Sequence, residues 1–360
     1  MSKEKAPKEV KEKAVTGPEM SATDIKKEKL SKLLAFQTAM EKKYGDEILQ
    51  MGGMKKDHAV DTIPTGSVSL DVALGVGGLP QGRIVEIYGP EASGKTTLTL
   101  QVISQAQRRG GLCGFIDVEQ ALDVSYAKQL GVKFDETLQI ASPEYGEQAL
   151  DILKDMISSG AFSVIVLDSV AALVPKKELE GEEFEANGAM GVMARNMSKA
   201  MRVLTPLIKQ NNVLVIFINQ IREKIGVMYG SPETTTGGNA LKFYASVRLR
   251  VRKASGEISL KVDGEEKPGY KMVVKLVKNK LNSPQEDVEL PIIYGMGVDA
   301  TFDLFGAAKA LEVITVTGRT HAFQEKAIAT SNDAALQALR DDKELAKAIE
   351  KEVRKRLEKK

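Results

Sequence analysis

The stretch Gly89-Pro-Glu-Ala-Ser-Gly-Lys-Thr96 decides the fold, because two glycines separated by four residues and followed by Lys and Thr fit the phosphate-loop pattern. It follows the apolar run 84–88 and opens a helix-like segment. The glycines let backbone N–H groups wrap a phosphate, and the start of the helix adds a favourable dipole. In this pattern Lys95 reaches the β- and γ-phosphates and the Thr96 hydroxyl binds Mg²⁺. The sequence therefore predicts a nucleotide-binding ATPase.

Short apolar runs alternate with helix-like segments on both sides of this loop. The runs are 84–88, 112–117, 164–168 and 213–219, and the helix-like segments are 96–109, 121–130, 146–159 and 194–210. This alternation is typical of βαβ units, and it predicts an α/β fold with a mostly parallel twisted sheet flanked by helices. A strand-rich region follows, with runs at 244–251, 271–277 and 288–294.

Four regions are expected along the chain. Residues 1–22 form a charged tail with few large apolar side chains, and 23–60 contain a helix and an oligomerisation segment. The ATPase core spans 61–297. Residues 298–360 form a small α/β C-terminal domain, rich in helix, that ends in a basic helix.

Composition narrows the function without deciding it. The 360 residues carry 51 Lys and Arg against 49 Asp and Glu, so the net charge of +2 neither demands nor excludes a polyanionic partner. Cys113, the single cysteine, rules out a disulfide framework, lies in an apolar run as a buried thiol would, and fits a reducing compartment. With one cysteine and only two histidines, a zinc site is not expected. No apolar stretch is long enough to span a bilayer and no secretory signal is present, so we expect a cytoplasmic protein with no membrane partner.

Carboxylates near the strand ends are candidates for catalysis. Asp168 ends the apolar run 164–168, where a second ligand for the metal ion is expected, although many buried strands end in Asp at a turn. Glu119 lies just past the run 112–117 and is the better candidate for the general base. Asp117 and Asp123 are equally well explained as residues that cap the following helix.

Gln220 and the loop after it form the second informative region. An amide at the tip of a buried strand can sense the γ-phosphate, or it can be a solvated strand end. The loop 221–238 is long and rich in Gly, Thr and Pro, which is typical of a functional loop. Its charged and apolar side chains suit single-stranded nucleic acid, and its glycines equally suit an active-site lid.

Together these motifs resemble the bacterial RecA family of homologous-recombination ATPases. The resemblance rests on Gly-Pro-Glu-Ala-Ser-Gly-Lys-Thr-Thr, Phe-Ile-Asp-Val-Glu, Val-Ile-Val-Leu-Asp-Ser, Phe-Ile-Asn-Gln-Ile-Arg and Tyr-Gly-Ser-Pro-Glu-Thr-Thr-Thr-Gly-Gly-Asn, and it covers about residues 30 to 300. It implies a RecA-like core with an N-terminal polymerisation helix. It also implies an ATP-bound helical filament on single-stranded DNA that pairs with homologous duplex DNA and exchanges strands.

The resemblance assigns roles in the nucleotide site. Glu119, Lys95 and Gln220 match the catalytic residues, with Glu119 as general base and Gln220 linking the γ-phosphate to DNA. Thr96 and Asp168 match the Mg²⁺ site, and Phe243 matches a relay across the subunit interface. The expected ATP contacts are Gly89, Pro90, Glu91, Ala92, Ser93, Gly94, Lys95, Thr96, Thr97, Asp123, Tyr126, Asp168 and Tyr294, with Lys278 and Lys280 supplied by the neighbouring subunit.

The resemblance also assigns DNA contacts, to loops near 181–193 and 221–238. The matching residues are Met190, Arg195, Arg202, Arg222, Lys224, Ile225, Gly237, Gly238 and Asn239. A filament of this family also promotes self-cleavage of a LexA-like repressor. A regulatory filament with little strand exchange, or another oligomeric P-loop DNA motor such as a ring helicase, remains an alternative reading. The first DNA loop and the segment 318–330 depart from the family pattern, and the usual acidic C-terminal tail is replaced by a basic end.

Overall fold

The computed structural model of the chain describes residues 22–45, 60–180, 191–223, 233–262, 265–283 and 287–357. The chain divides into two compact units, Met1–Ala59 and Val60–Lys360. In the first unit helix α1 (Ala22–Tyr44) is described, and it matches the helix predicted from the apolar spacing. Four large apolar side chains of this helix are about half exposed: Leu30, Leu33, Leu34 and Phe36. Most of the expected charged tail 1–22 lies outside the described residues.

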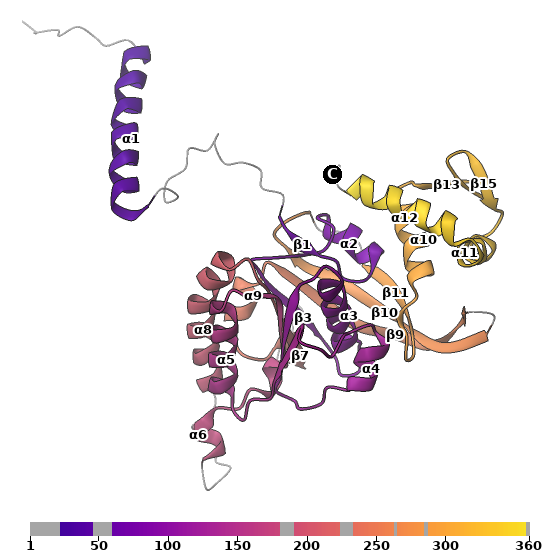
Figure 1. Cartoon of the computed structure of the whole chain (residues 1–360), viewed down its shortest axis with the longest axis horizontal. Helices are drawn as coiled ribbons and strands as arrows, with labels where there is room; N and C mark the ends of the chain where they lie inside the picture. The colour runs from indigo at the N-terminus through magenta and orange to yellow at the C-terminus, as the bar shows by residue number, and fades with distance from the viewer. Residues whose placement is uncertain are drawn as a thin grey trace, which may run out of the picture. The chain divides into compact units, whose positions relative to one another are not determined.

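A ten-stranded sheet forms the centre of the second unit (Figure 1). Its order is β12-β11-β10-β9-β3-β7-β6-β4-β5, with β8 paired to β7. Six neighbouring strands, from β9 to β5, run parallel, whereas β10, β11 and β12 extend the sheet antiparallel. The strands are β3 (Ile84–Gly89), β4 (Leu112–Asp117), β5 (Leu138–Ala141), β6 (Phe162–Asp168), β7 (Leu214–Glu223), β8 (Glu233–Thr235), β9 (Val247–Val262), β10 (Glu265–Asn279), β11 (Val288–Ile293) and β12 (Gly297–Val298). The predicted α/β fold with a mostly parallel sheet is confirmed.

Helices cover both faces of this sheet, which explains why its central strands are apolar almost throughout. Helices α3 (Lys95–Arg108) and α4 (Val124–Gln129) contribute to the hydrophobic core on one face, and α5 (Gly146–Ser158) and α8 (Val192–Gln210) to the core on the other. Strand β6 shows the division most clearly. Val164 and Val166 belong to the first core and Ile165 and Leu167 to the second, because successive side chains of a strand point to opposite faces.

The strand register places the candidate functional residues at one edge of the sheet. Gly89 of β3 is directly paired with Gln220 of β7, and Asp117 of β4 is paired with Asp168 of β6. The carboxyl ends of these parallel strands therefore lie side by side. In open α/β sheets this edge is where ligands bind.

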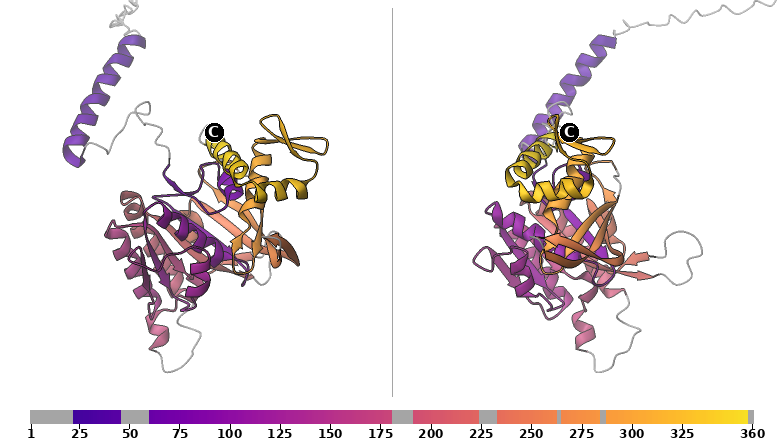
Figure 2. Two further views of the ribbon diagram at one scale, coloured as in Figure 1. Left: turned by 45° about the vertical axis from the view of Figure 1, so that its right-hand side comes forward. Right: turned by 90° about the vertical axis from the view of Figure 1, so that its right-hand side faces the viewer.

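The C-terminal part of the second unit has a core of its own, separate from the two cores of the sheet. Its elements are α10 (Ala300–Ala310), β13 (Ile314–Thr317), β14 (Thr320–Phe323), β15 (Lys326–Ala329), α11 (Asn332–Asp341) and α12 (Lys343–Leu357). Figure 2 shows this part, in yellow, beside the orange antiparallel strands. It is tied to α2 (Val68–Leu74) by the Ser67 hydroxyl, which donates to Asp303 Oδ1 at 2.8 Å. Residues 300–357 thus form a small α/β region with a three-stranded antiparallel sheet.

Three predicted boundaries were wrong. The helix expected at 121–130 begins only at Val124, because Asp123 caps it by accepting the Tyr126 N–H. The strand expected to end at Asn219 runs to Glu223, because its last three residues pair with β8. Gln220 therefore lies inside a strand rather than beyond one. The run 244–251 contains the end of a helix, α9 (Ala240–Tyr244), before β9 begins.

The remaining short elements are β1 (Thr62–Ile63), β2 (Leu79–Pro80), the 3₁₀ turn η2 (Val170–Ala172) and α6 (Lys176–Leu179).

Candidate functional site

The phosphate loop connects β3 to α3 in the strand–loop–helix context that its chemistry requires. Gly94 precedes the helix with φ of 97°, a left-handed conformation that glycine adopts without strain. Gly89 is needed for a different reason. A Cβ built there would lie 2.0 Å from the carbonyl oxygen of Val251, so only glycine lets β3 and β9 approach this closely.

Lys95 is the cation of the loop. It is largely buried, and its Nζ donates a hydrogen bond to the carbonyl oxygen of Pro90 at 2.7 Å. Burial lowers the pKa of Lys95, and the carboxylates of Asp168, Glu119 and Glu91 oppose this shift. A desolvated cation held against its own loop is well placed to bind the anionic oxygens of a phosphate chain.

Thr96 and Asp168 meet at the start of α3. The Thr96 hydroxyl donates to Asp168 Oδ2 at 3.0 Å, although the two residues are 72 positions apart. Burial raises the pKa of Asp168 to about 6, and the carboxylates of Glu119 and Asp117 add to this shift. A hydroxyl and a carboxylate in contact beside the phosphate loop are the oxygen ligands that Mg²⁺ accepts alongside nucleotide phosphates.

Glu119 lies within hydrogen-bond reach of two donors, one in strand β7 and one directly after β6. The Ser169 hydroxyl donates to Glu119 Oε1, and Gln220 Nε2 donates to the same oxygen at 3.3 Å. The second oxygen, Oε2, accepts no hydrogen bond from the described residues and could accept a proton from water. Sequence reasoning did not identify Ser169, whose only signal was its position directly after Asp168.

Asp123 caps helix α4, as one of the two interpretations of its sequence position predicted, whereas Asp117 binds the backbone of the loop before that helix and does not cap it. Asp117 accepts the N–H groups of Ala121 and Leu122 at 3.2 and 3.1 Å, and Asp123 Oδ1 accepts the Tyr126 N–H at 3.0 Å. Neither residue lines the pocket next to the phosphate loop.

That pocket has a volume of about 290 Å³. Its lining residues are Ala92, Ser93, Gly94, Lys95, Thr96, Thr97, Tyr126, Tyr270, Ile292, Tyr294 and Gly295. One end is thus the phosphate loop, and the other is aromatic. The Tyr126 hydroxyl hydrogen-bonds to Thr97 Oγ1 at 2.9 Å, and the rings of Tyr270 and Tyr294 lie 5.7 Å apart. The predicted residues Tyr126 and Tyr294 are therefore brought to the loop, together with Tyr270, which was not predicted.

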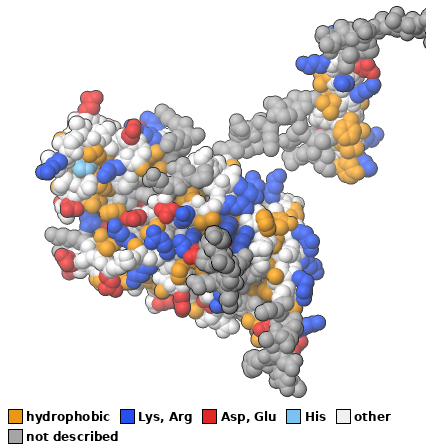
Figure 3. Space-filling model, turned by 180° about the vertical axis from the view of Figure 1, so that it is seen from behind, with side chains coloured by type: hydrophobic (Ala, Val, Ile, Leu, Met, Phe, Trp, Pro, Cys, Tyr) orange, Lys and Arg blue, Asp and Glu red, His pale blue; other side chains and the backbone are white. Residues whose placement is uncertain are grey.

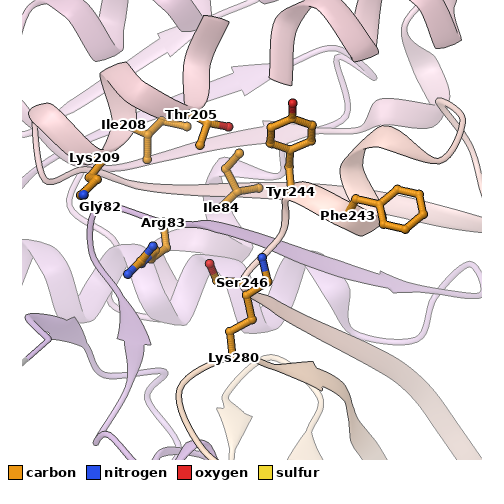
Figure 4. Close-up of a pocket in the computed structure, with 10 residues that line it drawn as sticks. All are labelled: Gly82, Arg83, Ile84, Thr205, Ile208, Lys209, Phe243, Tyr244, Ser246 and Lys280. Carbon is orange, nitrogen blue, oxygen red and sulfur yellow. The ribbon is translucent and has the colours of Figure 1, made fainter. Parts of the chain in front are cut away.

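Lys278 and Lys280 are not brought to this pocket within the protomer. Lys280 lines a different pocket of about 320 Å³, together with Arg83, Lys209 and Phe243 (Figure 4). Figure 4 shows the Phe243 ring pointing away from these cations, and its side chain is 73% exposed. Lys278 Nζ instead donates to the carbonyl oxygens of Lys242 and Phe243, at 2.7 and 2.9 Å.

A buried polar network connects β3 to the strand that carries Gln220. Asn219 Nδ2 donates to Glu86 Oε1 at 3.0 Å, and Arg248 Nε forms an ion pair with Glu86 Oε2 at 2.5 Å. The Thr236 hydroxyl donates to Asn219 Oδ1, which links the network to the residues after β8. Sequence reasoning missed this network. The sequence signal that could have revealed it is a glutamate, Glu86, inside the apolar run 84–88, because a charge in a buried strand needs a partner.

The predicted DNA contacts Arg195 and Arg202 are exposed on α8. Lys199 and Lys209 are exposed on the same helix, and the four residues fall at positions i, i+4, i+7 and i+14, which share one face of an α-helix. Figure 3 shows Lys and Arg side chains, in blue, along the margin of the core on which α8 lies. Lys199 and Lys209 extend the basic stripe beyond the predicted residues.

Gly237 and Gly238 pack against the first turns of α8, and Gly237 also packs against η2. Both have φ near 80°, and a Cβ on Gly238 would lie 2.9 Å from Ala194 Cβ. Asn239 directly precedes α9, with no side-chain hydrogen bond to the helix, and Arg222 is exposed in the part of β7 that pairs with β8. The three other predicted DNA contacts, Met190, Lys224 and Ile225, lie outside the described residues, as does most of the expected first DNA loop.

Comparison with known proteins gives consistent matches over almost the whole chain. The RecA N-terminal domain family matches residues 32–299. Protein RecA of Aquifex pyrophilus is 49% identical over 327 residues, which are 91% of this chain and 92% of that protein. Protein RecA 2 of Myxococcus xanthus is 49% identical over 330 residues (91% and 90%), and Protein RecA of Thermus thermophilus is 50% identical over 319 residues (88% and 92%).

Proposed function

The chain belongs to the RecA family of DNA-dependent recombination ATPases, and from this premise we propose that it binds ATP between two protomers of a filament on single-stranded DNA. The protein is a DNA-dependent ATPase that acts in homologous recombination and DNA repair. The observation that carries the proposal is the position of Gln220. Its side chain contacts Glu119 in the nucleotide site, and its strand continues directly into the stem of the predicted DNA loop.

Each residue of the nucleotide site has a role that its geometry supports. Backbone N–H groups of the phosphate loop and Lys95 hold the phosphates, and Tyr126 and Tyr294 contact the base. Glu119 removes a proton from the attacking water, and the hydrogen bond from Ser169 fixes the orientation of its carboxylate. Asp123 supports the base-binding end by starting the helix that carries Tyr126.

Thr96 and Asp168 are the residues that would hold Mg²⁺. When bound, the ion neutralises charge on the phosphate oxygens and helps to place them for attack. Among the described residues no group of three or more His, Cys, Asp or Glu side chains gathers to hold a metal ion. The site therefore depends on the nucleotide, because phosphate oxygens and water must complete the coordination.

Lys278 and Lys280 act on the ATP of the neighbouring protomer. Support comes from their absence from the phosphate-loop pocket of their own protomer and from the exposed Phe243 beside them. Cations supplied from a neighbour complete the phosphate site only when the filament is assembled. Nucleotide binding and polymerisation are then coupled. Helix α1, with its half-exposed apolar residues, is proposed to dock on an adjacent protomer.

The DNA-binding surface includes the basic stripe of α8, Arg222, and the glycines at 237 and 238. Exposed basic residues at successive turns of α8, Arg195, Lys199 and Arg202, suit the phosphates of a single strand, whose binding is largely electrostatic. The loops near 181–193 and 221–238, with Met190, Lys224 and Ile225, are proposed to complete this surface. Homologous duplex DNA is the proposed second partner.

A regulatory output on a LexA-like repressor is also proposed, since the same filament would present the surface that such a repressor binds.

A cytoplasmic location is proposed as well. The buried thiol of Cys113, whose pKa is raised by burial to about 12, is compatible with a reducing cytoplasm. Within the described ranges no helix is long and apolar enough to cross a membrane.

Strand-exchange and repressor-cleavage assays on one preparation would separate the recombination output of the filament from its regulatory output on a repressor.

Hydrolysis of ATP with and without single-stranded DNA tests the proposal. We expect strong stimulation by DNA in the unmodified protein and loss of hydrolysis in Lys95→Ala. Lys347→Ala removes a surface lysine of α12 and serves as the matched control, with activity unchanged. Absence of stimulation by DNA would contradict the proposed function. Closed rings rather than filaments in electron micrographs would favour the oligomeric P-loop motor instead.

A further inference from the structure

Three tyrosines line the pocket next to the phosphate loop, and two of their hydroxyls already have partners within the protein. The Tyr126 hydroxyl is paired with Thr97 Oγ1 at 2.9 Å, and the Tyr294 hydroxyl accepts a hydrogen bond from Lys253 Nζ at 3.0 Å. The Tyr270 hydroxyl forms no hydrogen bond with any of the described residues. Because Tyr270 lines the pocket, this hydroxyl is available to pair with a molecule bound there.

Tyr270 is held firmly in place. Tyr270 is 6% exposed and belongs to the hydrophobic core under α3. In the strand register it is paired with Ile292 of β11. Its ring contacts the ring of Tyr294, and Lys253 Nζ lies 4.9 Å from its centroid. A side chain fixed on a strand by these contacts presents its hydroxyl in one direction, and little entropy is lost when a ligand binds.

The hydroxyl points to the phosphate loop. A Cβ built on Gly94 would lie only 2.8 Å from the Tyr270 hydroxyl oxygen, so this oxygen lies directly against the residue before Lys95. At the same time the Tyr270 ring adjoins Tyr294, at the end of the pocket that is proposed to hold the base. Tyr270 therefore spans the region between the base and the β- and γ-phosphates. In a nucleotide, the α-phosphate and the ribose occupy this region.

We propose that Tyr270 is a nucleotide-binding residue whose hydroxyl donates a hydrogen bond to the α-phosphate. The inference rests on the proposed function, because it assumes that ATP occupies the pocket. The donor is well suited to an anion, since burial raises the pKa of Tyr270 to about 12 and the phenol keeps its proton at neutral pH. The contact is the same for ATP and ADP, so it contributes to binding of both and not to the hydrolytic step.

Tyr270→Phe is the decisive variant, because it removes the hydroxyl and keeps the ring packing. Binding of ADP and the steady-state hydrolysis of ATP are measured for this variant, with Tyr145→Phe as the control for the same chemical change outside the pocket. We expect the ADP dissociation constant and KM for ATP to rise together by about tenfold, with kcat unchanged. Equal melting temperatures without nucleotide would show that the variant is folded.

A change of less than about twofold in ADP affinity would overturn the proposal. A phosphorothioate analogue of ATP with sulfur at the α-phosphate tests the contacted group. The unmodified protein should bind one diastereomer of this analogue more weakly than ATP, and Tyr270→Phe should lose that preference. An unchanged preference would show that the α-phosphate is not the acceptor. If the unmodified protein binds no ADP at all, the proposed function fails rather than the role of Tyr270.

Discussion

Gln220 Nε2 lies 3.3 Å from Glu119 Oε1, although the residues are 101 positions apart and lie on strand β7 and beyond strand β4. Glu119 is the candidate base, and Gln220 leads within three residues to the end of β7 in the stem of the predicted DNA loop. A movement of that stem would therefore change the hydrogen bond between Gln220 and the Glu119 carboxylate. We therefore propose that this hydrogen bond is a route by which DNA binding alters hydrolysis.

Replacement of Gln220 tests this route. In Gln220→Ala the amide is lost, so we expect the rate of DNA-stimulated ATP hydrolysis to fall by about tenfold or more, while ATP binding is retained. Turnover is measured with and without single-stranded DNA, and nucleotide affinity is measured separately. Gln139→Ala, at an exposed position of β5, is the control. Full stimulation by DNA in Gln220→Ala would mean that the signal reaches the site by another path.

Glu119→Gln tests the general base. The amide keeps the size of the side chain and can still accept the Ser169 hydroxyl hydrogen bond, but it cannot take a proton from water. We expect hydrolysis to fall by roughly 10²- to 10⁴-fold while ATP and DNA are still bound. Glu136→Gln, an exposed residue outside the pocket, should behave as the unmodified protein. Turnover within about threefold of normal would exclude Glu119 as the base.

A mixing experiment tests whether each ATP site is shared by two protomers. Lys95→Ala damages the phosphate-loop half and Lys280→Ala the opposite half, so filaments of both variants contain some interfaces with two intact halves. In a random equimolar mixture about a quarter of the interfaces should be intact, and hydrolysis should recover to a corresponding fraction. Lys280 is preferred to Lys278, because Lys278 also supports the backbone of α9.

The control for mixing combines Lys95→Ala with Glu119→Gln. Both changes lie in the same half of the site, so no interface in that mixture is intact and no recovery is expected. Recovery in neither mixture, with both variants assembling normally on DNA, would show that Lys280 does not act on a neighbour's ATP.

Asp71 makes the stability of the protein depend on pH. Burial raises its pKa from 3.8 to about 7, and the nearby Asp303 carboxylate adds to the shift whereas Thr65 and Arg354 oppose it. Because the folded state holds the proton more tightly than the unfolded state, this group contributes stability below pH 4 that is lost as the pH rises through 7. The loss is on the order of 2 to 4 kcal/mol.

In Asp71→Asn that pH dependence should disappear. The Asn Oδ1 atom can still accept the two hydrogen bonds from Thr65, at 2.8 Å each, so the fold is expected to remain intact. Denaturant unfolding at pH 5 and pH 8 should show a smaller loss of stability at the higher pH in the variant than in the unmodified protein. The variant leaves the other charged residues of the pocket beside Asp71 unsubstituted. These are Arg108, Asp303, Glu350 and Arg354. An equal loss in both proteins would mean that Asp71 is not the titrating group.

Local sequence determined the elements that depend on neighbouring residues. The phosphate loop was identified from its glycines and the strand before it, and the central parallel sheet from apolar runs whose length and spacing reflect burial on both faces. Cys113 was predicted as a buried thiol for the same reason, and this is confirmed. The ends of individual helices and strands were predicted less accurately. Asp123 starts α4 later than the apolar pattern indicated, and pairing with β8 lengthens the strand that carries Gln220, because a cap and a distant strand partner override local preference.

Only the tertiary structure decided which side chains share the nucleotide site. Ser169 contacts Glu119 across 50 positions, and Tyr270 comes to the phosphate loop from an antiparallel strand that has no motif of its own. Neither contact is visible in the sequence, since it arises from sheet order and register rather than from spacing along the chain. The phosphate loop by itself specifies that a nucleotide binds. The fold around it specifies which residues contact the candidate base Glu119, and it places Lys280 in a pocket other than the one beside the phosphate loop.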